Sequence, residues 1–436
     1  MTPLAMVHAA AAQTALPPEL SAPSPVEPAQ ALTLAQAEDL ARTGNLQIQQ
    51  ASHQIQSARA NLSSQRAPIN PTLDYAALNN TVAPIDGFGM LSNYSAYVTI
   101  ETNGARGFRT KQAGAQLKGS QADALTQQLT VNQGVADAYS DLQVANAALH
   151  NEIDVYGLTQ QLANLTQKQF QLGAAPEANS IRAGIALTEE QQNLIAAATQ
   201  VRLARVALNV QMGRDPSTAV DTAQPLGYGA VTTVDRDAIL DLASRSRPEI
   251  ASANAAVTAA QANVGLERAQ SIPDLTLGRQ LDVGPVSVGL ILPLDLGSIK
   301  GSVRKAQEDV QVQQFQAKQI KLSAAQDVEN AWLNLKQTQA QVLLYQQGIL
   351  PQSESLLNRV TQGFSLGAST ILDVVDAQQT YRSTRNNYYT AIGAYNHAVD
   401  QINRAVGSPV AAMPTGSTFV PAVSPALSAN GTTQQR

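Results

Sequence analysis

The sequence predicts a mainly α-helical protein with a small β part, built from two copies of one unit. Three observations lead to this fold class. The 436 residues include 71 Ala and 48 Gln, and both residue types favour long helices. Segments recur at a nearly constant offset along the chain. Within each copy the apolar period changes once, from helical spacing to strict alternation, which is typical of a strand pair between helices.

The duplication is seen in matched segments. Residues 40–41 are Leu-Ala, as are residues 242–243, an offset of 202 positions. Residues 170–174 read Phe-Gln-Leu-Gly-Ala and residues 364–368 read Phe-Ser-Leu-Gly-Ala, an offset of 194. The decrease in the offset occurs within the strand pair, so the first copy is expected to have the longer loop there.

The repeats divide the chain into five segments. We expect the first repeat over 31–214 and the second over 235–407, joined by a linker over 215–234. Residues 1–30 are expected to be a signal-like, Pro-rich leader, because small apolar residues precede a run of Pro. Residues 408–436 are rich in Pro, Ser, Ala and Thr without a period, which predicts a disordered tail.

Each repeat is predicted to contain two helices, a β-hairpin, a very long helix and a return helix. A proline stops the helix that precedes each hairpin, either Pro68 or Pro71 in the first repeat and Pro273 in the second. Gly just after each long helix marks its end. The expected hairpins are 72–102 and 275–293, the long helices 105–171 and 298–363, and the return helices 176–212 and 370–406.

The long helices carry an apolar seam with alternating steps of four and three residues, the pattern of a coiled coil. Shifting the seam by 193 positions gives the same register in the second repeat. A simple coiled-coil rod would have the same seam but would not explain the hairpins between the helices. The seam positions are Val131, Val135, Ala138, Leu142, Ala145 and Leu149, and then Ala324, Val328, Ala331, Leu335, Thr338 and Val342.

The hairpin strands alternate apolar and polar residues over about 8–9 positions, close to the length of a membrane-spanning strand. Val286, Val288, Leu290 and Leu292 illustrate the pattern. Such alternation suits a transmembrane barrel wall, but an amphipathic hairpin on a soluble core has the same pattern. Four strands cannot close a barrel, since the smallest bacterial ones need about eight, so a transmembrane role requires several chains.

Composition argues against several functions. The net charge is −5 and aromatic residues make up 4%, which does not fit a nucleic-acid binder. With no Cys and four His without ligand spacing, we expect no metal site. The sequence contains no set of nucleophile, base and orienting residue and no cofactor motif, so we expect no enzyme and no cofactor.

Two segments resemble the TolC-like outer membrane factor (outer membrane efflux protein) family. Residues 364–378, which begin Phe-Ser-Leu-Gly-Ala-Ser-Thr-Ile-Leu-Asp, resemble its helix-turn signature, and Leu-Thr-Leu-Ala-Gln-Ala over 32–37 resembles its opening. The duplicated layout from 31 to 409 also fits that family.

The resemblance implies a homotrimer with a 12-helix α-barrel and a 12-stranded transmembrane β-barrel, four strands coming from each chain. It implies a passive conduit in the outer membrane that extends into the periplasm, within a tripartite efflux or type I secretion system. The implied partners are outer membrane lipid, a periplasmic adaptor (membrane fusion protein) and an inner-membrane pump of the RND, ABC or MFS type. A periplasmic coiled-coil scaffold protein is the alternative.

The resemblance also suggests a periplasmic aperture lined by Asp373, Asp376 and Asn179, the last being the equivalent of Asp373 in the first repeat. The two Asp are three residues apart and therefore share a helix face, so three chains would form two acidic rings that favour cations. A local alternative exists, because Thr370-x-x-Asp373 is also a capping-box pattern.

The turns between long and return helices are the implied adaptor contacts, with Gly173 and Ala174 in one turn and Gly367 and Ala368 in the other. A glycine that merely ends a helix would look the same. Phe364 and Ser369 stand where the family often has Tyr and Arg. The resemblance therefore implies that this chain lacks some of the polar contacts that hold the aperture shut.

Overall fold

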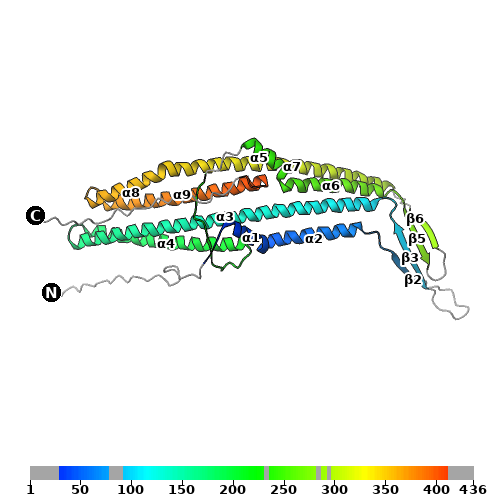
Figure 1. The fold of residues 1–436 in the computed structure, drawn as a ribbon, viewed down its shortest axis with the longest axis horizontal. Coiled ribbons are helices and arrows are strands. Elements are labelled where there is room, and N and C mark those ends of the chain that lie inside the picture. Colours follow the sequence, from blue (N-terminus) through cyan, green and yellow to red (C-terminus); the bar gives the residue numbers. More distant parts are fainter. Residues whose placement is uncertain (1–28, 78–91, 230–234, 281–285, 292–295, 411–436) are drawn as a thin grey trace, which may run out of the picture.

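The computed structural model describes residues 29–77, 92–229, 235–280, 286–291 and 296–410. The described chain is long and narrow, with helices along its length and a four-stranded sheet at one end (Figure 1). The predicted leader and tail lie almost entirely outside the described residues, as does the loop of the first hairpin over 78–91.

The first repeat consists of a short helix, a second helix, a hairpin, a long helix and a return helix. Thr33 starts the first helix with a complete capping box, in which its hydroxyl accepts from the Gln36 N–H and the Gln36 side chain accepts from the Thr33 N–H. The elements are α1 (Leu34–Gly44), α2 (Leu46–Arg66), β2 (Thr72–Ala77), β3 (Ser92–Ile100), α3 (Ala105–Gln171) and α4 (Glu177–Gln211).

The second repeat has the same order, but its long helix is not continuous. A turn of π-helix, η1, interrupts it, where the sequence predicted one helix over 298–363. Pro351 follows this turn; it has no N–H to donate and its ring displaces the carbonyl of the previous turn, which favours a widened turn at this point. The elements are α5 (Arg236–Ser246), α6 (Pro248–Ala269), β5 (Asp274–Gln280), β6 (Val286–Ile291), α7 (Leu296–Leu344), η1 (Tyr345–Ile349), α8 (Leu350–Ser365) and α9 (Ile371–Val406).

The helices form a layer in which shorter helices meet end to end beside longer ones. In the first repeat α2 and α4 both pack along α3 (Figure 1). In the second repeat α6 and α9 pack along α7 in the same way. The repeats join because α3 also packs against α6 and α9, which leaves α4 at one edge of the layer and α7 with α8 at the other.

Both end-to-end joints depend on a glycine with positive φ. Gly213 (φ 71°) follows α4, and a side chain there would overlap the Gly44 carbonyl oxygen at the end of α1. Asn45 Nδ2 closes this joint by donating to the Gln211 carbonyl at 2.8 Å. Gly407 (φ 80°) occupies the equivalent position after α9.

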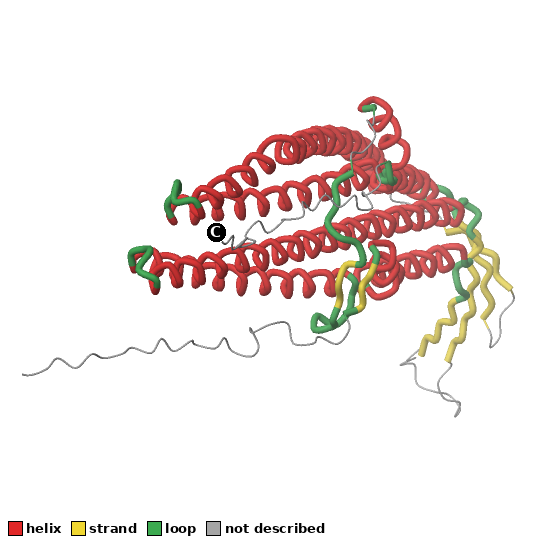
Figure 2. Tube along the Cα trace, turned by 60° about the vertical axis from the view of Figure 1, so that its left-hand side comes forward, coloured by secondary structure: helices red, strands yellow, loops and turns green. Residues whose placement is uncertain are grey.

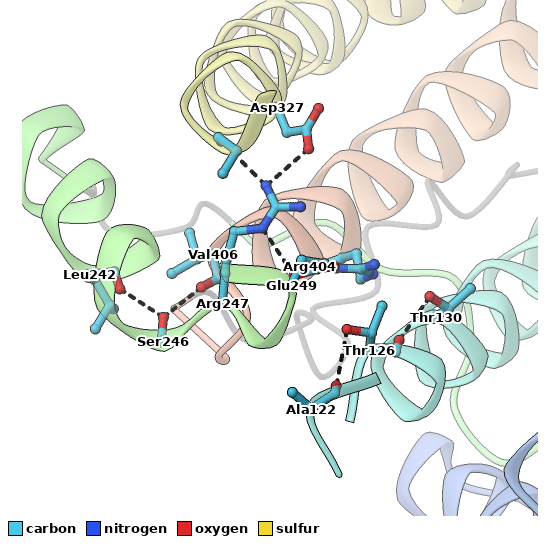
Figure 3. Close-up of polar contacts among 11 residues, drawn as sticks. Ala122, Thr126, Thr130, Leu242, Ser246, Arg247, Glu249, Asp327, Arg404 and Val406 are labelled. Carbon is cyan, nitrogen blue, oxygen red and sulfur yellow. Dashed lines mark hydrogen bonds and ion pairs between the residues drawn. The ribbon is translucent and has the colours of Figure 1, made fainter. Parts of the chain in front are cut away.

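The second joint is also stabilised by a hydrogen bond and by ion pairs between side chains (Figure 3). Ser246 Oγ donates to the Val406 carbonyl at 2.6 Å. The buried Arg247 donates to Asp327 on α7 at 2.9 Å and pairs with Glu249 at 3.3 Å. Each joint thus fixes where a return helix ends and the helix beside the hairpin begins.

The predicted coiled-coil seam lies in the core. Val131, Val135, Ala138 and Leu142 are buried in a cluster with α1 and α4 residues, and Ala145 and Leu149 pack against that cluster partly exposed. All six seam positions of the second repeat are buried, namely Ala324, Val328, Ala331, Leu335, Thr338 and Val342. The seam prediction is confirmed in both repeats.

The sheet is antiparallel with the order β2-β3-β5-β6, so the two hairpins are joined edge to edge. The pairing places Val98 opposite Leu277 and Leu277 opposite Val288, which makes an apolar row across three strands. The neighbouring row contains Thr99 and Thr276. Because side chains alternate along a strand, the apolar and polar rows lie on opposite faces, as the sequence predicts.

A second, small sheet was not predicted. Gln30–Leu32 (β1) pairs in parallel with Val220–Thr222 (β4), which brings the junction of the expected leader and first repeat onto the expected linker. Three-residue strands are too short to show a period, so sequence patterns could not reveal them.

None of the helices within the described ranges is both long enough and apolar enough to cross a membrane.

Candidate functional site at the helical tips

The two turns between long and return helices lie at the end of the molecule opposite the large sheet (Figures 1 and 2). One joins α3 to α4 and the other joins α8 to α9. All the aperture and docking residues predicted from the sequence lie in or next to these two turns. The structure therefore brings them to one end of the molecule.

Both turns have the same backbone geometry. Gly173 (φ 70°) donates to the Phe170 carbonyl at 2.9 Å, and Ala174 donates to the Gln169 carbonyl at 2.8 Å. This pair of bonds is a Schellman motif, which satisfies the last carbonyls of a helix. Gly367 (φ 76°) and Ala368 repeat it in the second turn. The two glycines are needed for helix termination, whatever else they contact.

Each turn also exposes a leucine that the sequence analysis did not single out. Leu172 is 83% exposed and Leu366 is 76% exposed. No other described heavy atom lies within 4 Å of a Cβ built on Gly173 or Gly367, so the surface beside both leucines is open. An apolar residue directly before a helix-ending glycine is the sequence signal that could have revealed them.

Asp373 is exposed at the start of α9 and takes part in the capping box. Its carboxylate accepts the Thr370 N–H at 2.8 Å and the Thr370 hydroxyl at 2.7 Å, while the Asp373 N–H donates to the Thr370 hydroxyl at 3.3 Å. These hydrogen bonds hold the pKa of Asp373 below its ordinary value. The local capping alternative is confirmed, and the carboxylate stays charged and exposed.

The other predicted aperture residues differ in exposure. Asp376 is exposed one turn further along α9, on the same side as Asp373. Asn179 is partly exposed in the first turn of α4, where its N–H donates to the Pro176 carbonyl at 3.1 Å. Asn179 therefore lies on the first helical hairpin, formed by α3 and α4, and the two Asp lie on the second, formed by α8 and α9.

Near the tips the two helical hairpins touch through apolar side chains. Leu162 and Ala183 of the first helical hairpin are buried with Ile371 and Val374 of the second helical hairpin. Phe364 packs against this cluster, which explains an aromatic ring without a hydroxyl at that position. Ser369 lies inside the second turn, where its N–H donates to the Gly363 carbonyl at 3.2 Å.

Polar contacts between the hairpins lie further from the tips. Arg385 of α9 is 2% exposed and donates to Asp154 of α3 at 3.2 Å. It also donates to the hydroxyls of Tyr389 at 2.8 Å and Tyr381 at 3.3 Å. Burial opposes the charge, but the two tyrosine oxygens and Asp154 outweigh it and raise the pKa of Arg385. The guanidinium is therefore a fixed positive charge between α3 and α9.

A second ionic contact spans three helices. Arg382 of α9 pairs with Glu190 of α4 at 3.1 Å, and Asn386 donates to Glu152 of α3 at 2.7 Å. Burial raises the pKa of Glu190, although Arg382 opposes the shift. Sequence reasoning missed these residues because partners such as Glu190 and Arg382 lie 192 positions apart.

Comparison with known families gives one match, which covers most of the chain. The model of the family described as "Outer membrane efflux protein" matches residues 38–214 and 239–408. The two matched segments correspond to the two structural repeats.

Several characterised proteins are similar in sequence. The cobalt-zinc-cadmium resistance protein CzcC of Cupriavidus metallidurans is 24% identical over 394 residues, which cover 88% of this chain and 92% of that protein. The pyoverdine export outer membrane protein OpmQ of Pseudomonas putida is 28% identical over 340 residues, covering 71% of this chain and 68% of OpmQ.

Solved structures share the fold. The outer-membrane channel OprN superposes with a TM-score of 0.73 at 19% identity, covering 86% of this chain and 90% of that chain. CusC, whose structures are described in terms of transmembrane channel formation, superposes with a TM-score of 0.74 at 18% identity, covering 87% of this chain and 93% of CusC.

Proposed function

We infer the function of this chain from its membership of the outer membrane efflux protein family. The family suggested by residues 364–378 and 32–37 is thereby confirmed. The chain is an outer membrane channel subunit of an efflux system and extends into the periplasm.

We propose that the working unit is a homotrimer. The observation that carries this proposal is an apolar stripe left exposed at each edge of the helix layer, one on α4 and one along α7, η1 and α8. Two different edges that fit each other form a head-to-tail contact, which closes into a ring when the rotation allows. Three chains would then give twelve helices around a conduit and twelve strands in a closed barrel. The exposed residues are Ile181, Ile185, Leu203, Val206 and Val210 on one edge, and Val312, Phe315, Leu322, Leu333, Leu344, Ile349 and Leu356 on the other.

The first test is envelope fractionation with the chain expressed behind a functional signal peptide. Outer membranes are solubilised in mild detergent, and unheated and boiled samples are compared by size. We expect a trimer in the outer membrane that boiling converts to a monomer. A soluble periplasmic monomer or dimer would instead support the scaffold alternative.

We propose that the tip turns bind the periplasmic adaptor of a pump in the inner membrane. The two exposed leucines and the open space beside Gly173 and Gly367 support this assignment. We expect L172D/L366D to form trimers but to lose efflux in a host that lacks its own channel. The matched control is L172M/L366M, which keeps the apolar surface and should retain efflux. Normal efflux by the aspartate variant would rule the turns out as the docking site.

We propose divalent metal cations as the first cargo to test. CzcC is named for cobalt, zinc and cadmium resistance, and rings of Asp373 and Asp376 would attract cations in a trimer. Growth of the complemented host is measured in cobalt, zinc and cadmium salts with a CzcC-type pump and adaptor. Growth no better than with the empty vector would direct the search to organic cargo.

The aperture role of the two aspartates is tested in planar bilayers. Under a salt gradient the reversal potential of the D373N/D376N trimer should move from the cation-selective side toward zero. D309N serves as the control, because Asp309 is an exposed carboxylate on α7 far along the chain from the tip. An unchanged reversal potential would mean that these carboxylates do not line the conductance path.

A further inference from the structure

Five titratable side chains gather where the first repeat meets the second. Asp137 and Asp141 come from α3, His397 and Asp400 from α9, and Glu38 from α1. His397 Nε2 lies 3.1 Å from Asp141 Oδ1. The electrostatic influence of Asp137, His397 and Glu38 all reaches Asp400. None of these residues belongs to the tip site, and the proposed conduit function does not use them.

Asp400 is the unusual member because it is buried without full hydrogen bonding. It is 8% exposed, and within the described residues its Oδ2 has no hydrogen-bond partner. Asp137 Oδ1 is buried without a partner in the same part of the structure. A buried carboxylate oxygen without a partner costs free energy unless it carries a proton.

Asp400 also lines a small cavity. The cavity has a volume of about 210 Å³ and is lined by Glu38 of α1, by Asn132 of α3 and by Arg404 of α9 besides Asp400. Arg404 is a basic side chain in this lining, but its guanidinium lies 2.7 Å from Glu249 of α6. The positive charge of Arg404 is therefore already matched by another carboxylate.

The protonation of the cluster follows from this environment. Burial, reinforced by the neighbouring Asp137, raises the pKa of Asp400 to about 8. The close contact with Asp141, with added attraction from Asp137, outweighs burial and raises the pKa of His397 to about 8. Burial also raises the pKa of Glu38 and of Asp137.

The charge of the cluster consequently changes in one direction over a narrow pH range. At about pH 6.5 Asp400 is protonated and neutral, and His397 is a positively charged imidazolium. Above about pH 8 both groups have lost a proton, so the net charge of the cluster has become more negative. The positive charge of His397 is then lost and a negative charge appears on Asp400, so the carboxylates of Asp137, Asp141 and Asp400 repel one another in a contact that excludes most water.

We propose that the contact between α3 and α9 at Asp137, Asp141, His397 and Asp400 is a pH-sensitive contact between the two repeats. It holds the two repeats together when His397 and Asp400 both carry a proton, and it loosens when both are deprotonated. This contact does not depend on the cargo, the adaptor or the pump, so it can be tested independently of the proposed function.

The sign of the effect on stability is fixed by the two shifts. A group that holds its proton more tightly in the folded state stabilises the fold at low pH, and this contribution is lost as the pH rises to the folded pKa. For Asp400 the loss runs from about pH 4 to about pH 8, and for His397 from about pH 6.5 to about pH 8. The steepest fall in stability is therefore expected between pH 6.5 and pH 8.

The first experiment measures the unfolding temperature of the purified full chain in detergent from pH 5.5 to pH 9. The wild type should lose several degrees across pH 6.5–8. D400N should lose less, and H397Q should start lower at pH 6 and then change less. D309N and H150Q replace an exposed aspartate and an exposed histidine outside the cluster and should follow the wild type. Wild-type pH dependence in both D400N and H397Q would overturn the proposal.

The second experiment links α3 to α9 covalently and does not rely on a charge change. The chain has no cysteine, and a Cβ built on Gly393 lies 3.9 Å from the Cβ of Val144, within the range of a disulfide. These positions are one turn from His397 and Asp141. V144C/G393C can therefore be oxidised to tie α3 to α9 beside the cluster.

The fluorescence of Trp332 is the readout, because Trp332 is the single tryptophan and packs against the core cluster that contains α9 residues. Its emission in the wild type and in reduced V144C/G393C should shift between pH 6 and pH 9. In the oxidised variant the shift should be lost. The same shift in the oxidised and reduced forms, or no shift in the wild type, would overturn the proposal even if D400N did not fold.

Discussion

At the scale of single residues, the helix ends are fixed by glycines that are not equivalent. Gly173 and Gly367 end helices in open space, whereas Gly213 ends α4 against the backbone of Gly44. All three need a positive φ, which L side chains adopt only with strain. Only at Gly213 is there also no room for a Cβ.

This difference predicts unequal costs of alanine substitution. G173A should lower the free energy of unfolding by about 1 kcal/mol, the usual cost of a left-handed non-glycine residue. G213A should cost at least about 3 kcal/mol, because the α4 end and the α1 end must also move apart. Chemical denaturation of both variants measures the two values. Equal losses would mean that the joint yields without cost.

The capping box at the start of α9 leads to a second prediction. T370A removes the hydroxyl that bonds the Asp373 N–H and its carboxylate, so the pKa of Asp373 should rise toward its ordinary value. Helix stability should fall by about 1 kcal/mol, as for other N-cap losses. Carboxyl NMR or a pH titration of stability checks the shift. In the wild type the contribution of Asp373 is present at neutral pH and is lost as the pH falls below about 4, since the folded pKa is depressed.

At the scale of elements, η1 distinguishes the two long helices. α3 runs uninterrupted for 67 residues, or roughly 100 Å, whereas the second long helix contains a π turn. A π turn holds one residue more than an α turn, so it inserts a residue while the flanking faces keep their directions. Leu350 and Leu357 after the turn remain buried, as Val342 is before it.

Two single-residue deletions test this interpretation. Deletion of Gly348 should turn η1 into regular α-helix and leave the buried face of α8 in place, with little change in the unfolding temperature. Deletion of Ala340, within regular α7, should rotate everything that follows by about 100° and bury polar residues, with a loss of several kcal/mol. Similar losses for the two deletions would show that η1 is not an inserted residue.

At the scale of the whole molecule, the chain is an open layer with unmatched edges. α4 and α7 with α8 each show apolar side chains to solvent, and β2 and β6 are edge strands of a four-stranded sheet. Open sheet edges and long apolar stripes are both normally covered in a working assembly. Closure by identical chains, as proposed above, would cover the helix edges and the strand edges together.

The trimer proposal predicts a sharp effect of a charge in one stripe. Phe315 on α7 is 65% exposed in the single chain and would face α4 of the next subunit. F315D should therefore prevent the heat-modifiable trimer while leaving the monomer helical by circular dichroism. F315L keeps the apolar surface and should assemble. Normal trimers from F315D would place the subunit contact elsewhere.

The duplication, the long helices, the two hairpins and the family could all be predicted from the amino-acid sequence. These features depend on local periods and on short segments such as residues 364–378, which can be recognised without knowing any distant contact. The apolar seams also followed from the sequence, because a heptad pattern states which face of a helix must be buried.

The burial of polar residues, and the residues that they contact, could not be predicted without the three-dimensional contacts. Arg385 and Asp154, like Asp400 and Asp137, are far apart in sequence, and a charged residue looks the same there whether it is exposed or buried. The strands β1 and β4 are too short for a period, and η1 is a local widening of a helix that Pro351 alone did not require. The physical reason is common to all of them: the free energy of a buried charge or a three-residue strand depends on the neighbour that packs against it, and that neighbour comes from another part of the chain.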